Sequence, residues 1–328
     1  MSTIKDVAKQ AGVSIATVSH IVNGTKSVTP KTRKKVLKAI EELNYATNQT
    51  AKSFKTGHKN MIAFVVPDIS NNYFANIIDS LEEELRKSGY HLIITNTKEK
   101  KEREFQQLKY LTSGITDGII LASTARTYTE ICSYIPDGFP VVLIDRKLDD
   151  SPLDIVSVSD SRAITDGMCR LILNGHTKIG YIGDFPHLST ARERLKTYKD
   201  ILKKHGIPTN ETFIRSTSSL SHEAYHITGE LLADGCTAIV IGNNLMTADA
   251  YSYLYKNGKA FPDVQILGYY HRDLAQFFSS EDGIIVMNEK DMGIAAARQI
   301  LDRIKNPEQS QKEIIIYNQY AADFEHIR

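Results

Sequence analysis

Between Met61 and Met287 the sequence alternates short apolar runs with segments of helical character, and this alternation restricts the fold more than any other feature. The helical segments are about ten to seventeen residues long, as in the β-α-β units of parallel sheets. Most of the short runs are continuous apolar stretches, which is typical of strands covered on both faces. We predict strands at 61–67, 91–96, 118–122, 141–145, 179–183, 238–242, 265–268 and 284–287, with a further strand-like run at 314–317.

These strands are too many for one small sheet, so we predict an α/β body of two similar lobes with parallel sheets. A break near residue 160 separates the lobes. Lobe 1 would comprise about 61–160 and 290–318, and lobe 2 about 161–289 with the C-terminal end, which together make a body of 61–328.

Residues 1–46 carry a different pattern, that of three short helices. Thr3 and Asp6 resemble a capping box, and Gly12 can end the first helix in the left-handed conformation. Ser14 would cap a second helix after a tight turn, which gives a helix-turn-helix. A third helix would start at Thr29-Pro30. The predicted buried stripes are Ile4, Val7, Ala8 and Ala11, then Val18, Ile21 and Val22, then Val36, Leu37, Ile40 and Leu43.

The net charge of +1 conceals an asymmetry along the chain. Residues 1–60 hold eleven Lys and Arg against three Asp and Glu, a net charge of +8, so the remaining residues carry −7. A basic head on an acidic body suggests that the head binds a polyanion.

The exposed side of the second helix predicts how such a head would read DNA. Ala16 and His20 are four residues apart, outside the buried stripe, where they could meet base edges in the major groove. Ile15 lies close to the stripe by angle, so it is either a core residue or a base contact. The short hydroxyl side chains suited to phosphate oxygens are Ser14, Thr17 and Ser19.

A longer set of positions at fixed spacing resembles the DNA-binding domain of LacI/GalR-family repressors. The matched positions run from Thr3-Ile4-Lys5-Asp6-Val7-Ala8 through Ala11-Gly12-Val13-Ser14, Thr17-Val18-Ser19 and Asn23 to Val28-Thr29, Thr32-Arg33, Val36, Ala39-Ile40, Leu43 and Tyr45. The resemblance implies base readout by Ile15, Ala16 and His20, with Tyr45 on a phosphate.

The same resemblance implies a hinge helix at 48–55, within a hinge and linker of 47–60, that enters the minor groove. A helix this short is marginal in water, so folding on DNA makes physical sense. Thr47 stands where the family has proline, and Phe54 where it has a leucine wedge. Phe54 would unstack a base step, the reading we favour, or pack on the body. The hinge residues expected on DNA are Ala51, Lys52, Phe54 and Lys55.

The body resembles the periplasmic sugar-binding-protein-like body of the same family, so the likeness covers nearly the whole chain. Ligands of such folds bind beyond the carboxyl ends of strands, and in the family the effector lies between the lobes. Tyr73 is either a lining or a core residue, and Asp145-Arg146 is either a structural ion pair or a ligand contact. The candidate effector-binding residues are Ser70, Tyr73, Phe74, Ser123, Arg146, Asp160, Arg194, Asn243 and Tyr270.

The body departs from the family at two carboxylates that typically accept hydrogen bonds from sugar hydroxyls. The usual Asn-Asp pair is Asn243-Asn244, and the usual Gly-Phe/Tyr-Asp is Gly268-Tyr269-Tyr270. An amide and a phenol change the charge and the donor pattern. We therefore expect a cleft less acidic than a sugar site, which favours an anionic or aromatic effector or a cleft without a ligand.

Other functions find little support in the sequence. The segment 222–226 matches the H-E-x-x-H zinc pattern, but such a short match arises readily by accident. No phosphate loop, dinucleotide fingerprint or nucleophile elbow is present, so we expect no cofactor, no metal and no catalysis. With no signal peptide, no apolar run of membrane-spanning length and three widely spaced cysteines, we expect a cytoplasmic protein with no membrane partner.

These features together predict a transcription regulator, most simply a repressor, that binds a pseudo-palindromic operator in double-stranded DNA as a homodimer. One helix-turn-helix reads a half-site, so two-fold protein symmetry matches two-fold DNA. A small-molecule effector between the lobes would modulate the affinity. A solute-binding protein and an enzyme with a fused DNA-binding domain are the rival classes, and activation or dual control stays open within the regulator class.

Overall fold

The computed structural model of the chain describes residues 2–23, 26–45, 58–259, 264–271 and 283–321. Met1–Lys59 and Asn60–Arg328 form two separate compact units, which we call the head and the body. In the described part of the chain, no helix combines the length and apolarity needed to span a membrane.

The head contains the three predicted helices. They are α1 (Ile4–Ala11), α2 (Ile15–Asn23) and α3 (Pro30–Glu42). The capping box of Thr3 and Asp6 is confirmed, and Gly12 ends α1 at φ 65°, in the left-handed region that favours glycine. Ser14 Oγ accepts the backbone N–H of Thr17 at 3.1 Å, as the predicted cap of α2 requires.

The three helices close a small apolar core around Val7, Val18 and Val36, which are fully buried. One predicted core residue is wrong: Leu37 is 49% exposed, and Ala39 lies on the buried side of α3 instead. The stripe that turns inward therefore follows Val36, Ala39 and Ile40 at the three- and four-residue spacing of a helix face.

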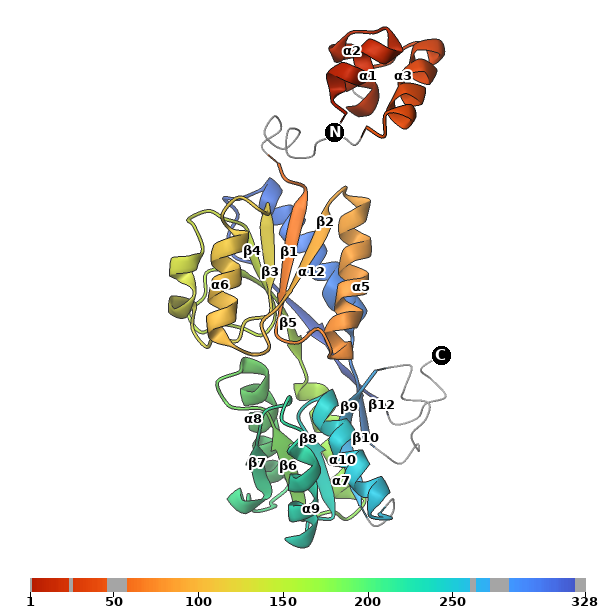
Figure 1. Cartoon of the computed structure of the whole chain (residues 1–328). Coiled ribbons are helices and arrows are strands. Elements are labelled where there is room, and N and C mark those ends of the chain that lie inside the picture. Colours follow the sequence, from red (N-terminus) through yellow and green to blue (C-terminus); the bar gives the residue numbers. More distant parts are fainter. Residues whose placement is uncertain (1, 24–25, 46–57, 260–263, 272–282, 322–328) are drawn as a thin grey trace. The chain divides into compact units, whose positions relative to one another are not determined.

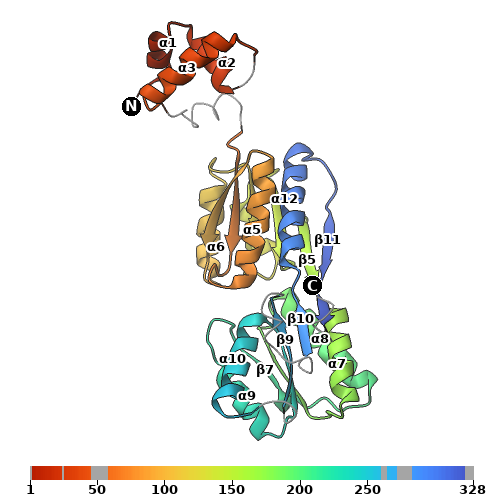
Figure 2. The same cartoon turned by 90° about the vertical axis from the view of Figure 1, so that its right-hand side faces the viewer.

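Lobe 1 of the body is built on a six-stranded sheet in the order β11-β5-β4-β3-β1-β2 (Figure 1, with β11 in Figure 2). Every neighbouring pair in it is parallel. Residues of β1 alternate between two cores, with Phe64 on one face of the sheet and Val65 on the other. The strands are β1 (Met61–Val66), β2 (His91–Asn96), β3 (Gly118–Leu121), β4 (Val141–Asp145), β5 (Asp154–Ser159) and β11 (Glu313–Tyr317).

Lobe 2 repeats this plan with a sheet in the order β12-β10-β9-β8-β6-β7. Its strands pair in parallel, except that β12 is antiparallel to β10. The strands are β6 (Ile179–Gly183), β7 (Ile214–Ser216), β8 (Ala238–Ile241), β9 (Gln265–Tyr270), β10 (Gly283–Val286) and β12 (Gln319–Ala321).

Helices cover both faces of each sheet. In lobe 1, α5 (Asn72–Lys87) and α12 (Glu289–Lys305) lie side by side on one face, and α6 (Lys101–Leu111) packs on the other (Figures 1 and 2). In lobe 2, α7 and α8 contribute to one apolar cluster while α9 and α10 contribute to another. These helices are α7 (Ser161–Leu173), α8 (Ser189–Lys204), α9 (Ala224–Ala233) and α10 (Asn244–Lys256). Short 3-10 turns occupy Tyr128–Glu130, Cys132–Tyr134 and Glu211–Phe213.

The chain passes between the lobes three times. It leaves lobe 1 between β5 and α7, returns between β10 and α12, and crosses again between β11 and β12. The α/β architecture with two parallel-sheet lobes is thus confirmed. The strands absent from the predicted set are β5, whose Asp154, Ser157 and Ser159 interrupt its apolar character, and the three-residue β7 and β12.

The packing of α5 against α12 generates a prediction about Gly293. A Cβ atom built there would lie 2.1 Å from Ser80 Oγ and 2.5 Å from the Ile77 carbonyl oxygen, so alanine would force the helices apart. We expect Gly293→Ala to lower the free energy of unfolding by about 1–3 kcal/mol in urea titrations, as overpacked cores do. Lys290→Ala, at an exposed position of the same helix, serves as the control. Equal stability of the two variants would contradict the close approach.

Candidate functional site

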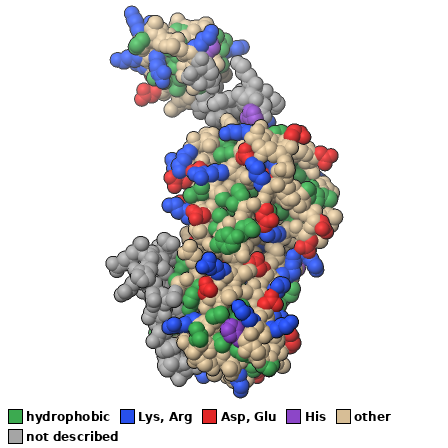
Figure 3. Space-filling view, turned by 180° about the vertical axis from the view of Figure 1, so that it is seen from behind, with side chains coloured by type: hydrophobic (Ala, Val, Ile, Leu, Met, Phe, Trp, Pro, Cys, Tyr) green, Lys and Arg blue, Asp and Glu red, His purple; other side chains and the backbone are tan. Residues whose placement is uncertain are grey.

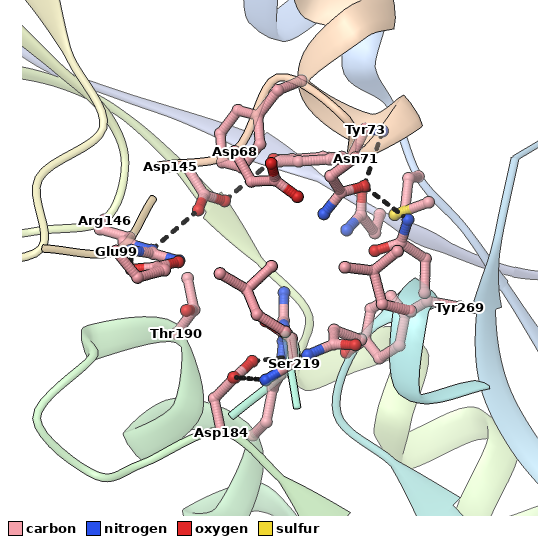
Figure 4. A pocket seen from close by; sticks show the side chains of 18 residues that line it. Asp68, Asn71, Tyr73, Glu99, Asp145, Arg146, Asp184, Thr190, Ser219 and Tyr269 are labelled. Carbon is pink, nitrogen blue, oxygen red and sulfur yellow. Dashed lines mark hydrogen bonds and ion pairs between the residues drawn. The ribbon is translucent and has the colours of Figure 1, made fainter. Parts of the chain in front are cut away.

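The carboxyl ends of strands from both lobes surround one cavity of the body (Figure 4). Its lining comes from the segments that follow β1, β2, β4, β6, β7, β8, β10 and β11, together with Asp145 at the end of β4 and Tyr269 in β9. This is where parallel sheets place ligand-binding groups. The cavity has a volume of about 50 Å³, enough for only a few water molecules. Of the predicted effector residues, those that line it are Tyr73, Phe74, Arg146, Arg194 and Asn243.

Arg146 is both an ion-pair residue and a lining residue. Its guanidinium nitrogens bind the two carboxylate oxygens of Glu99 at 2.6 and 2.9 Å, and Nη1 also approaches the Ser123 carbonyl oxygen at 3.4 Å. Asp145 is a weaker partner, with 3.7 Å between its Oδ2 and Arg146 Nε. The carboxylates of Glu99 and Asp145 raise the pKa of Arg146 against the effect of its burial, so the side chain stays charged. The predicted Asp145–Arg146 pair is therefore secondary to Glu99.

Asp145 occupies a restrained position at the end of β4. Its φ is +67°, a left-handed conformation that few residues other than glycine, asparagine and aspartate adopt. The Tyr73 hydroxyl donates to Asp145 Oδ1 at 2.9 Å, and both side chains are buried. Burial raises the pKa of Asp145, and the nearby Arg146 and Arg194 only partly oppose that rise.

Arg194 forms an ion pair with another carboxylate, that of Asp160. Its Nε donates to Asp160 Oδ2 at 2.6 Å, and its Nη1 donates to the Gly242 carbonyl oxygen at 2.5 Å. The guanidinium also lies over the Tyr269 ring, 4.6 Å from the ring centre, in cation–π geometry. Asp160 accepts a further hydrogen bond from Asn318 Nδ2 at 2.7 Å and orients Arg194 without lining the cavity itself.

The lobe 2 wall is organised around Asp184. Its Oδ2 accepts Asn243 Nδ2 at 2.6 Å, and its Oδ1 accepts the backbone N–H of Ser219 at 3.3 Å. Burial raises the pKa of Asp184, and Arg146 and Arg194 oppose the rise from a distance. Asn243 also caps α10, because its Oδ1 accepts the Met246 N–H at 2.8 Å.

Several hydrogen bonds connect the two lobes at the rim of the cavity. Asn244 Nδ2 donates to Asn71 Oδ1 at 2.7 Å, and Asn71 Oδ1 also accepts the N–H of Tyr73 as the cap of α5. A second connection is the ion pair of Arg192 Nη2 with Asp149 Oδ1 at 2.7 Å. The lobes are thus in contact around a nearly filled cleft.

Three predicted effector residues lie away from the cavity. The Ser70 hydroxyl donates to Asp68, and the buried Ser123 hydroxyl donates to Glu104 at 2.5 Å. Tyr270 packs in a small cluster with Tyr251, while its neighbour Tyr269 lines the cavity. Successive residues of a strand point to opposite faces, so a shift of one position selects the other tyrosine.

Glu99, Asp184 and Tyr269 line the cavity although they were not among the predicted site residues. Asp184 follows directly after a predicted strand, so its position was a usable signal. Glu99 comes three residues after β2, and its role depends on a contact with Arg146 that is distant in sequence.

The expectation of a cleft less acidic than a sugar site stays a prediction, but the cavity of this chain is not short of acidic groups. Although Asn244 and Tyr270 replace the usual carboxylates, the cavity is lined by four carboxylates and two guanidinium groups. Carboxylates from other strand ends supply the negative charge. These four are Asp68, Glu99, Asp145 and Asp184.

The two histidines of the zinc-like pattern do not share a helix. His222 has a φ of +58° and precedes α9, which begins at Ala224, whereas His226 lies within α9. His222 Nδ1 lies 3.0 Å from Asp249 Oδ1. The geometry of two ligands on successive turns of one helix is therefore not formed by this segment.

The predicted DNA-reading residues of α2 lie outside the core of the head. Ile15 is 45% exposed, which excludes the alternative of a buried core residue. Ser14 and Ala16 are exposed, while Thr17, Ser19 and His20 are partly exposed. Lys and Arg side chains are prominent on the surface of the head (Figure 3). Their contact with DNA stays a prediction.

Tyr45 is partly buried against the core of the head. The predicted hinge helix at 48–55, with Ala51, Lys52, Phe54 and Lys55, lies outside the described residues.

Two family models match the chain. Residues 3–48 match bacterial regulatory proteins of the lacI family, and residues 59–324 match periplasmic binding proteins and the sugar-binding domain of the LacI family. Among curated proteins, the transcriptional repressor PurR of Photobacterium profundum is 32% identical over 321 residues, which cover 93% of each chain. The probable transcriptional regulator EndR of Paenibacillus polymyxa is 28% identical over 96% of this chain and 94% of its own.

Solved structures share the fold. The lac repressor dimer bound to operator and the anti-inducer ONPF has a TM-score of 0.84 at 20% identity, covering 98% of this chain and 97% of its own. A LacI family regulator of Enterococcus faecium with bound ribose has a TM-score of 0.70 at 27% identity, covering 79% of this chain and 96% of its own.

The burial of Asp145 generates a prediction about pH. Because its pKa is raised in the folded state, the folded protein binds this proton more tightly than the unfolded chain, and stability is lost as pH rises through the raised pKa. Asp145→Asn removes that loss and keeps a residue that tolerates the positive φ. We expect the variant to melt at a higher temperature than the parent near neutral pH.

That advantage should shrink as pH falls below the raised pKa of Asp145, where the parent is also neutral at this position. Thermal unfolding of both proteins across a series of pH values measures it. Asp166→Asn, at an exposed site on α7, is the control and should change little. An advantage of Asp145→Asn that grew toward acid pH would contradict the assignment.

Proposed function

The chain belongs to the LacI family of bacterial regulatory proteins, and we propose that it is a transcriptional repressor that binds a pseudo-palindromic operator as a homodimer. The observation that carries this proposal is the outer surface of α2. Ile15 and Ala16 are exposed there while Val18 is fully buried, so the helix can rest on its core and present its other side to the major groove.

The dimer follows from the size of the reading unit. One helix-turn-helix covers only a half-site, and two copies related by two-fold symmetry match a palindrome. Similar proteins include the repressor PurR, and the lac repressor, which shares the fold, forms a dimer on its operator. We infer the same arrangement for this chain, acting on double-stranded DNA in the cytoplasm.

A small molecule in the cleft would control the affinity for DNA. The two lobes are linked by three crossings and by rim hydrogen bonds such as Asn244 to Asn71, which can break and reform as the lobes open and close. A ligand that prefers one arrangement shifts the population toward it and biases DNA binding through the coupling between the two sites. The lining residues proposed to contact it are Tyr73, Phe74, Arg146, Arg194 and Asn243.

Selection of bound sites from random duplex DNA at two salt concentrations tests the proposed function. We expect enrichment of a palindrome with a pyrimidine–purine step at its centre, because a dimer reads two half-sites and its hinge wedge would open a flexible step. Binding that is salt-sensitive but selects no sequence would contradict a sequence-specific regulator.

Replacement of His20 tests the role of α2. We expect His20→Ala to relax the preference at one base pair of each half-site by about 1–3 kcal/mol, because a lost base-edge contact no longer discriminates between bases. Lys38→Ala, on the exposed surface of α3, should change affinity for all sequences alike or leave it unchanged. An unaltered preference in His20→Ala, measured by competition with single-base operator variants, would contradict the placement of α2 in the major groove.

A further inference from the structure

The cleft carries an excess of negative charge. Four carboxylates line it against the guanidinium groups of Arg146 and Arg194. Just behind the lining, Asp160 pairs with Arg194 and Lys98 pairs with Asp68, which adds one charge of each sign. With every group ionised, the cleft has a net charge of −2.

The pairing pattern shows which carboxylates lack a cation of their own. Lys98 contacts Asp68 at 2.7 Å, Arg146 contacts Glu99 at 2.6 Å, and Arg194 contacts Asp160 at 2.6 Å.

Two carboxylates are then left, one on each wall. Among the described residues, the polar contacts of the Asp145 side chain on the lobe 1 wall are the 3.7 Å approach of Arg146 and the hydrogen bond from the Tyr73 hydroxyl, and Arg194 acts on it from a distance. Asp184 on the lobe 2 wall receives hydrogen bonds from neutral groups alone among the described residues, the Asn243 amide and the Ser219 N–H. Figure 4 shows Asp145 and Asp184 on opposite sides of the cavity.

Buried polar atoms without a hydrogen-bond partner provide a second, independent sign of a ligand. The Nε of Arg146 and the hydroxyl of Tyr269 make no hydrogen bond of normal geometry within the described residues, although the Asp160 carboxylate lies near Tyr269. Both residues are more than nine-tenths buried and both line the cavity. Buried donors of this kind are costly unless a ligand or water supplies an acceptor.

We propose that the effector of this cleft is a small hydroxylated amine, whose ammonium group pairs with Asp184 while its hydroxyl groups bind Asp145, Arg146 Nε and Tyr269. A protonated amine offsets the excess charge, whereas an anion would deepen it. Hydroxyl groups both accept and donate, so they satisfy the donor atoms and the second carboxylate together. The inference rests on the proposed function only in treating the ligand as a regulator.

The closed cavity sets a condition on binding. The cavity has a volume of about 50 Å³ and the Asn244–Asn71 hydrogen bond joins its two walls, so we expect the lobes to separate as the ligand enters. Opening breaks the Asn244–Asn71 bond, and a ligand that spans both walls then replaces it. Binding should therefore change the distance between the lobes.

Matched compounds test the charge preference. Glucosamine, galactosamine and 2-amino-1,3-propanediol would be titrated calorimetrically against the full chain without DNA. Each would be compared with its neutral counterpart (glucose, galactose, glycerol) and its anionic counterpart (gluconate, galacturonate, glycerate). We expect at least one amine to bind at least tenfold more tightly than both of its counterparts. Tighter binding of a neutral or anionic member, or binding by none of the nine, would overturn the proposal.

Variants of Asp184 and Asp145 test whether these two carboxylates cause the preference for amines. Asp184→Asn should abolish the tighter binding of the amine relative to its counterparts. Asp145→Asn should weaken the binding of the amine and of both of its counterparts. Asp166→Asn, exposed on α7, should leave both unchanged. Thermal unfolding of each variant would verify its fold. An amine preference that survives in folded Asp184→Asn would contradict the assignment. Because no DNA is present, these outcomes are independent of operator selection.

Discussion

Three passages of the chain between two parallel sheets are the constraint on which the rest of the body depends. A parallel sheet gathers the carboxyl ends of its strands at one edge, and the crossings bring the two gathered edges together. Short segments after β1, β4, β6 and β8 then reach a common space without long loops. Helices pack closely within lobe 1, as at Gly293, where α12 lies against the backbone of α5.

The charged side chains at the strand ends lie in a nearly filled cleft, so their charges must be compensated by other protein groups. Buried charges are stable only where partners and hydrogen bonds compensate them. Arg146 and Arg194 meet this demand through Glu99 and Asp160, each of which comes from a different segment of the chain. Asp145 and Asp184 are compensated less well, and burial raises the pKa of both. We therefore propose that the cleft gains more from a cation than from an anion, whereas the two missing carboxylates by themselves favour an anionic or aromatic effector or a cleft without a ligand.

Much of the fold could be predicted because local chemistry determined it. The Thr3 and Asp6 box and the turn at Gly12 are made by neighbouring residues, and the strand His91–Asn96 is marked by three consecutive apolar residues at its centre, Leu92–Ile94. The site was harder to predict because its details depend on distant partners and on register. Ser123 follows a predicted strand, yet its hydroxyl donates a hydrogen bond to Glu104 and does not line the cavity. Tyr270 and Tyr269 are adjacent, and only the pairing of β9 with its neighbours decides which one faces the cleft. The prediction that Leu37 is buried was wrong because Ala39, and not Leu37, lies on the face of α3 that packs on the core.

The replacement of a carboxylate by Asn244 also acquires a physical meaning from the structure. An aspartate there could only accept hydrogen bonds, and it would face the Asn71 Oδ1 atom, which already accepts from the cap of α5. The amide of Asn244 donates to Asn71 instead, so the two lobes are joined by a direct hydrogen bond. A carboxylate at this position could accept a hydrogen bond from a ligand hydroxyl but could not make this contact. The closed arrangement then has its own stabilising contact in the absence of a ligand. An effector must replace this contact when it binds. Its effect therefore depends on the difference in free energy between the closed cleft and the cleft with the effector bound.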